Sequence, residues 1–222
     1  MHVWRVELTA VSDELLELLN KGERERAERL LNAGEGQLWA RSRGVLRALL
    51  GRYLRNGPGT LRFAVGEHGK PELLDEATGS AAPRKPGSAS PPDLTFNLSH
   101  SGALALYAFA RAAAVGVDVE VARRPLDEIA LAARAFGPAE ARRLTVLDPA
   151  MRNREFLRLW VRHEAELKCR GSGFGGARAA DTSGGKLWIS ELEMGARAAA
   201  AVVVSATPRE VRLWRWQIQP AS

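Results

Sequence analysis

Valine alternates with glycine or an acid along residues 116–121, whose sequence is GVDVEV. Alternation of β-branched residues with polar or small ones predicts a β-strand that has one buried, apolar face. Side chains two residues apart on a strand point to the same face, so Asp118 and Glu120 are expected to lie together. Two neighbouring carboxylates can share one divalent cation. The alternative is that both are surface charges on an edge strand.

A second constraint comes from residues 160–168, with the sequence WVRHEAELK. Trp160, Glu164 and Lys168 recur at four-residue steps, which places them on one stripe of an α-helix. An acid and a base one turn apart, together with two acids on a strand, suit Mg²⁺ that holds a phosphate. The alternative is an ordinary ion pair on a helix surface, with Trp160 in the core.

The polar sequence NLSHS at 97–101 follows an apolar strand signal at 94–98. Asparagine and serine are typical turn formers, so we expect residues 99–101 to form a turn. His100 then either contacts a ligand or buttresses that turn.

The rest of the chain divides into strands and helices. Strands are expected at 2–9, 61–65, 104–110, 114–121, 186–194, 197–206 and 211–218. A first helix is expected at 12–31, and a second fills the segment between turns at 32–34 and 56–59. Further helices are expected at 126–136, 138–144 and 151–169. Residues 75–93, rich in Gly, Ser, Ala and Pro, are expected to be a mobile loop. Because each half runs from a strand through helices to further strands, we predict an α+β pseudo-dimer of two similar halves, residues 1–112 and 113–222.

Composition narrows the classes of partner and compartment. The net charge is +6, carried mostly by arginine, which favours an anionic partner. The basic residues are scattered, without the aromatic interleaving of single-strand-binding proteins, so no nucleic acid is expected. No apolar run approaches the roughly 20 residues of a membrane span, and no signal-peptide pattern begins the chain. With Cys169 as the single cysteine, these features predict a cytoplasmic protein without membrane contact.

In combination, these motifs resemble the 4′-phosphopantetheinyl transferases of the surfactin-synthetase-activating type. The pieces that carry the resemblance occur in order: LRF at 61–63, GKP at 69–71, FNLSHS at 96–101, GVDVE at 116–120, Phe136 with Glu140, and 160–168 with Gly171 and Gly173. The family moves the phosphopantetheine arm of coenzyme A onto a serine of an apo acyl or peptidyl carrier protein. It requires Mg²⁺ and releases 3′,5′-adenosine bisphosphate. The resemblance also implies coenzyme A in the cleft between two α+β halves, and the pseudo-dimer suggests a monomer.

The resemblance implies roles for single residues around the pyrophosphate. Asp118, Glu120 and Glu164 are expected to bind Mg²⁺, with Glu164 also the candidate base for the carrier serine. Lys168 is expected on the bridging phosphate, where it would stabilise the leaving group. His163 stands where the family usually has a phosphate-binding lysine, and histidine is mostly neutral at pH 7.

At the nucleotide end of coenzyme A, the resemblance implies four further contacts. Ser99 and His100 are expected at the 3′-phosphate, and Lys70 and Pro71 at the adenine and ribose end. The alternative for Lys70 is an exposed lysine in a turn. The stretch 35–39, EGQLW, lacks the basic cluster that the family often has there.

Two other functions stay open from the sequence. The histidine at 163 and the missing basic cluster allow a weakened relative that binds coenzyme A or a carrier protein without turnover. Glu166 and Lys168 also match the Glu-x-Lys pattern of Mg²⁺ nucleases. In those enzymes the pattern lies on a strand, whereas here it falls in a helical segment, where side chains two residues apart diverge.

Overall fold

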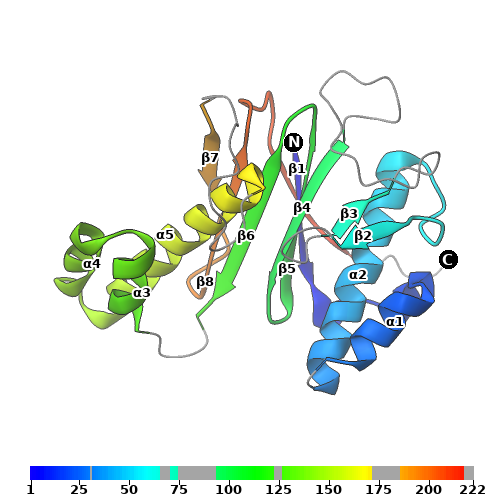
Figure 1. The fold of residues 1–222 in the computed structure, drawn as a ribbon, viewed down its shortest axis with the longest axis horizontal. Helices are drawn as coiled ribbons and strands as arrows, with labels where there is room; N and C mark the ends of the chain where they lie inside the picture. The colour runs from blue at the N-terminus through cyan, green and yellow to red at the C-terminus, as the bar shows by residue number, and fades with distance from the viewer. Residues whose placement is uncertain (31, 66–70, 75–93, 123–126, 172–185, 218–222) are drawn as a thin grey trace.

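A computed structural model describes residues 1–30, 32–65, 71–74, 94–122, 127–171 and 186–217. Two β-sheets lie face to face between two long helices, α2 (Ala33–Leu54) and α5 (Pro149–Arg170), as Figure 1 shows. The layers therefore run helix, sheet, sheet, helix. This arrangement confirms the α+β class, while the pairing of two similar halves and their division at 112/113 stay predictions.

The first sheet has the order β4-β5-β1-β9 and the second the order β6-β8-β7. The strands of the first are β4 (Leu94–Ser101), β5 (Leu104–Arg111), β1 (His2–Glu7) and β9 (Arg212–Arg215). Those of the second are β6 (Val115–Val121), β8 (Ala198–Val204) and β7 (Trp188–Glu191). Neighbours are antiparallel except β1 and β9, which run parallel, with Trp4 beside Trp214. A separate ribbon pairs β2 (Phe63–Val65) with β3 (Pro71–Leu73).

Burial on both faces explains the continuous apolar run of β5. Leu104 and Leu106 face the second sheet, in a core shared with Val117 of β6. Tyr107 and Phe109 point the opposite way, into the core under α2. A strand covered on both sides has no solvated face, so its sequence shows no alternation.

The predicted helix over 12–31 is instead two short elements. A 3₁₀ helix (Asp13–Leu18) is followed by α1 (Lys21–Glu28). A new helix begins at Lys21 because Asn20 and Glu23 form a capping box. The Asn20 side chain accepts a hydrogen bond from the Glu23 backbone N–H, and the Glu23 carboxylate accepts one from the Asn20 backbone N–H. Two further α-helices, α3 (Glu128–Ala135) and α4 (Pro138–Thr145), lie where they were predicted, and a 3₁₀ helix (Leu8–Ala10) follows β1.

The predicted turn at 99–101 is wrong. Residues 99–101 continue strand β4, opposite Leu106, Ala105 and Leu104 of β5. The chain reverses one residue later, at Gly102, whose φ of 57° is a conformation that glycine adopts readily. The predicted mobile loop at 75–93 lies outside the described residues, and none of the described helices is long and apolar enough to cross a membrane.

Candidate active site

Side chains of β4 reach across to β6 at the edge where the two sheets meet. Asn97, Ser99 and Ser101 are two residues apart and so share one face of β4. The Asn97 side-chain oxygen accepts a hydrogen bond from the backbone N–H of Val117, at 3.0 Å. Both serines donate to carboxylates of β6. We call the contact of these three β4 side chains with β6 the β4–β6 seam.

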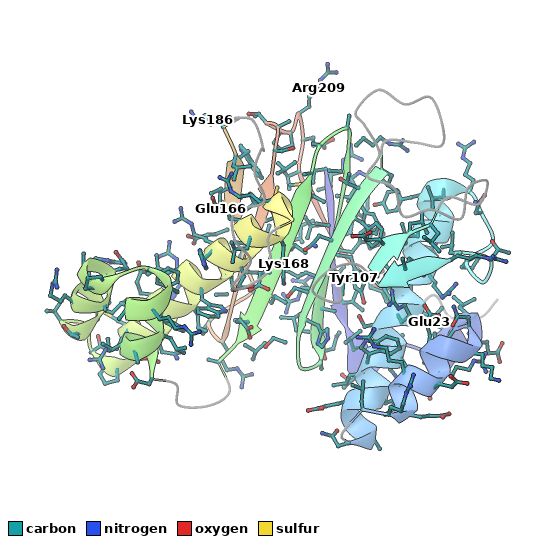
Figure 2. All side chains as sticks on the ribbon, viewed as in Figure 1. Glu23, Tyr107, Glu166, Lys168, Lys186 and Arg209 are labelled. Atoms are coloured by element: carbon teal, nitrogen blue, oxygen red, sulfur yellow. The ribbon has the colours of Figure 1, made fainter. Side chains whose placement is uncertain are left out.

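Asp118 lies at the centre of the seam and is paired with Lys168. Its Oδ1 atom accepts from the Lys168 ammonium at 2.6 Å and from the Ser99 hydroxyl at 2.7 Å. The ammonium also donates to the Ser99 oxygen at 3.0 Å, which closes a triangle of hydrogen bonds. Asp118 is 4% exposed, so this pair carries a desolvation cost that must be offset by its contacts. Figure 2 shows Lys168 reaching from α5 towards β6.

Glu164 is one helical turn before Lys168 on α5 and shares the electrostatic environment of the seam. Burial raises the pKa of the Glu164 carboxyl above its ordinary value. The negative charges of Asp118 and Glu120 add to this rise, and the Lys168 ammonium opposes it. The structure therefore brings Asp118 and Lys168 into direct contact and places Glu164 and Glu120 near enough for their charges to act on this site.

Two oxygen atoms in this cluster are suited to a cation. Asp118 Oδ2 and Glu164 Oε1 are buried and accept no hydrogen bond within the described part of the chain. Buried carboxylate oxygens without donors are costly, and a divalent cation would satisfy them. The carboxylates do not form a complete metal cage, since no three His, Cys, Asp or Glu side chains of the described ranges are grouped to hold an ion. Mg²⁺ commonly completes its shell with phosphate oxygens and water, so the residues present fit it.

Gly116 allows α5 to lie close to β6. A Cβ atom at this position would be 2.0 Å from the Ala165 carbonyl oxygen and 2.5 Å from the Cys169 nitrogen. The sequence motif contains this glycine, but only the packing of α5 against β6 shows that no larger residue fits there. Cys169 is buried and its thiol donates to the Ala114 carbonyl at 3.4 Å, which agrees with a packing role.

The other predicted site residues lie around this cluster. His163 packs edge-on against Phe136, with ring centroids 5.5 Å apart. His100 is exposed, and by strand alternation it points away from the face that carries Ser99. Pro71 begins β3 in the separate ribbon, and Lys70 lies outside the described residues. Whether these side chains contact coenzyme A stays a prediction.

Two residues of the seam have no role predicted from the sequence. Asn97 falls in the predicted strand and Ser101 in the predicted turn, whereas in the structure both hold β4 against β6. The usable signal was their spacing, because Asn97, Ser99 and Ser101 repeat with the period of a strand.

The pattern of Glu166 and Lys168 does not form a nuclease site. Both residues lie in helix α5, where Glu166 accepts from Arg170 while Lys168 donates to Asp118. Figure 2 shows the two side chains leaving α5 in different directions. They therefore do not share the single face that the nuclease pattern requires.

Comparison with known proteins identifies relatives that share these features. Residues 114–203 match the model of the 4′-phosphopantetheinyl transferase superfamily, a segment that contains β6 and α5. The 4′-phosphopantetheinyl transferase HetI of Nostoc sp. is 35% identical over 176 residues, which is 78% of this chain and 69% of that protein. A putative 4′-phosphopantetheinyl transferase of Synechocystis sp. is 34% identical over 159 residues, or 72% of this chain and 59% of the relative. The 4′-phosphopantetheinyl transferase Sfp of Bacillus subtilis is 24% identical over 162 residues, which is 73% of this chain and 64% of that protein.

Proposed function

The chain belongs to the 4′-phosphopantetheinyl transferase superfamily, and from this membership we propose that it transfers the 4′-phosphopantetheine arm of coenzyme A to a serine of an apo carrier protein. The observation that carries the proposal is the cluster of Asp118, Glu164 and Lys168, with two buried carboxylate oxygens that accept no hydrogen bond among the described residues. The order of the sequence motifs supports the surfactin-synthetase-activating type. Two sheets, each covered by one long helix, support the pseudo-dimer, and a monomer stays a prediction.

The reaction needs charge neutralisation and a proton acceptor. The carrier serine oxygen forms a bond to the phosphorus that bears the pantetheine arm, and the bond from that phosphorus to the bridging oxygen breaks. Asp118 and Glu164, with Glu120 as the third ligand that the resemblance implies, would hold Mg²⁺ together with oxygens of the pyrophosphate, where the ion would supply positive charge. The Lys168 ammonium stabilises the negative charge that develops on the departing 3′,5′-adenosine bisphosphate.

Glu164 has the properties of the base in this scheme. Its carboxylate accepts the proton that the serine hydroxyl loses, either directly or through a water. Burial, reinforced by the charges of Asp118 and Glu120, raises the pKa of Glu164 in the protein without ligands, and bound Mg²⁺ would oppose this rise. A raised pKa makes a carboxylate a better proton acceptor near neutral pH.

We expect this protein to add one phosphopantetheine to an apo carrier protein in the presence of coenzyme A and Mg²⁺. The measurement is intact-protein mass spectrometry across a panel of apo acyl and peptidyl carriers. Chelation by EDTA should abolish the mass gain, and excess Mg²⁺ should restore it, because the pyrophosphate charge is otherwise left uncompensated. Transfer that persists in EDTA would contradict the metal requirement. Coenzyme A binding by calorimetry without any mass gain would favour the weakened relative.

Added salt should slow the reaction with the carrier. The net charge of +6 favours encounter with acidic partners, and carrier proteins of this family are typically acidic helical bundles. We expect kcat/KM for the carrier to fall by about tenfold between low salt and roughly 0.5 M NaCl, since steering is screened over a Debye length. The kcat at saturating carrier serves as the control and should change little. A flat kcat/KM would show that charge does not guide the encounter.

A further inference from the structure

Ser101 occupies a defined hydrogen-bonding position at the end of the seam. Its hydroxyl donates to Glu120 Oε2 at 2.8 Å, and its oxygen accepts from the backbone N–H of Val121 at 3.1 Å. A serine hydroxyl has a single proton, so when that proton is directed at a carboxylate it cannot serve another acceptor. The backbone N–H of Val121 therefore fixes the position of the Ser101 oxygen, and the Ser101 hydroxyl in turn fixes the orientation of the Glu120 carboxylate.

The two serines of the seam repeat one arrangement. Ser99 donates to Asp118, and Ser101, two residues later on β4, donates to Glu120, two residues later on β6. Each carboxylate therefore has one oxygen held by a hydroxyl from the neighbouring strand. For Asp118, the other oxygen is buried and accepts no hydrogen bond among the described residues. Hydrogen bonds of this kind orient metal-binding carboxylates in other proteins.

We propose that Ser101 is a positioning residue, whose hydroxyl orients the Glu120 carboxylate so that it can bind a divalent cation together with Asp118 and Glu164. The inference rests on the proposed transferase function, because it assumes that these carboxylates hold the cation. It assigns Ser101 no contact with coenzyme A or the carrier serine.

The competing role is purely structural, because Ser101 also helps to join β4 to β6. Asn97 shows that the seam can be held without any contact to a carboxylate. A matched serine lies at the opposite end of β6. The Ser205 oxygen accepts from the backbone N–H of Ala114 at 2.9 Å, and no bond from its hydroxyl to a carboxylate is observed among the described residues. The Ser205→Ala variant therefore loses only a hydrogen bond to a backbone N–H, whereas Ser101→Ala also loses the hydrogen bond that orients a carboxylate.

The test measures Mn²⁺ binding by electron paramagnetic resonance, with the protein and saturating coenzyme A but no carrier. Ser101→Ala should weaken Mn²⁺ binding by about tenfold, at the lower end of the loss typical for residues that orient metal ligands. Ser101→Thr keeps the hydroxyl and should restore binding to within about threefold of the unchanged protein. Ser205→Ala should bind Mn²⁺ like the unchanged protein.

Kinetics provide a second readout. In Ser101→Ala the Mg²⁺ concentration for half-maximal transfer should rise by about tenfold, while kcat at saturating Mg²⁺ stays within about threefold. Unchanged Mn²⁺ affinity in Ser101→Ala, an equal loss in Ser205→Ala, or a failure of Ser101→Thr to restore binding would each overturn the proposal. If the unchanged protein transfers phosphopantetheine in any of these cases, only the role of Ser101 fails. If it neither binds Mn²⁺ nor transfers, the proposed function fails.

Discussion

Glu164→Gln should lower the rate of phosphopantetheine transfer by about a thousandfold, yet leave the melting temperature of the ligand-free protein unchanged or higher. Transfer is lost because glutamine neither accepts a proton nor contributes negative charge to a cation. The stability effect follows from the pKa of the Glu164 carboxyl, which is raised first by burial and then by the charges of Asp118 and Glu120. The ionised carboxylate therefore opposes folding, and glutamine has nearly its shape without its charge.

The raised pKa of Glu164 determines whether its contribution to the stability of the fold rises or falls with pH. Between the ordinary pKa of a glutamate and the raised value in the fold, the folded protein binds more protons at Glu164 than the unfolded chain does. The contribution of this group to stability therefore falls as the pH rises through that window. The stabilisation gained by Glu164→Gln should be larger at pH 7.5 than at pH 5.

Thermal melts with and without Mg²⁺ and coenzyme A provide the measurement. The ligands should raise the melting temperature of the unchanged protein more than that of Glu164→Gln. Glu166→Gln is the matched control, because Glu166 lies on the same helix but pairs with Arg170. The Glu166→Gln variant should transfer phosphopantetheine at close to the rate of the unchanged protein. A melting temperature several degrees lower in Glu164→Gln, or transfer at the unchanged rate, would contradict the role given to this carboxylate.

Gly116→Ala should reduce both stability and transfer. The new Cβ would lie 2.0 Å from the Ala165 carbonyl oxygen, and this atom belongs to the backbone of α5 rather than to a flexible side chain. The helix must move, and overpacking of this kind costs about 3 kcal/mol of unfolding free energy. For a chain of this size that corresponds to a loss of about 10 °C in melting temperature.

Displacement of α5 also separates Glu164 and Lys168 from Asp118. A misplacement of about 1 Å typically costs about a hundredfold in rate, so Gly116→Ala should lose transfer even below its melting temperature. Gly59→Ala is the control, because a Cβ there meets no atom within 4 Å. It should change the unfolding free energy by less than about 0.5 kcal/mol. Denaturation midpoints and transfer assays on both variants provide the measurements, and a Gly116→Ala protein with an unchanged midpoint would refute the packing argument.

The sequence predicted those parts of the site whose patterns are local. Alternating valines place Asp118 and Glu120 on one face of a strand, and the structure has that strand at Val115–Val121. The four-residue spacing of Glu164 and Lys168 places them on one stripe of α5. Each of these inferences depends on a single element and its period.

The spacing of Asn97, Ser99 and Ser101 indicates that they share one face, but their partners on β6 could not be predicted, because these depend on which strands become neighbours. Asn97 and Ser99 are typical turn formers, and pairing of β4 with β5 overrides that preference. No local pattern shows that Ser99 contacts Asp118, since the contact forms only when the two sheets meet. The break between the 3₁₀ helix and α1 is different, because asparagine at 20 followed by glutamate at 23 is a capping signal visible in the sequence.

The parallel pairing of β1 with β9 affects how the chain can fold during its synthesis. His2 pairs with Arg212, 210 positions later in the chain. At about 5–20 residues per second, the ribosome needs about 10–40 s to produce the second partner after the first. Throughout that time one edge of β1 lacks its neighbour, and an open strand edge is a template for pairing with other chains. The nascent protein is therefore open to misassembly at this edge of β1 until β9 has emerged.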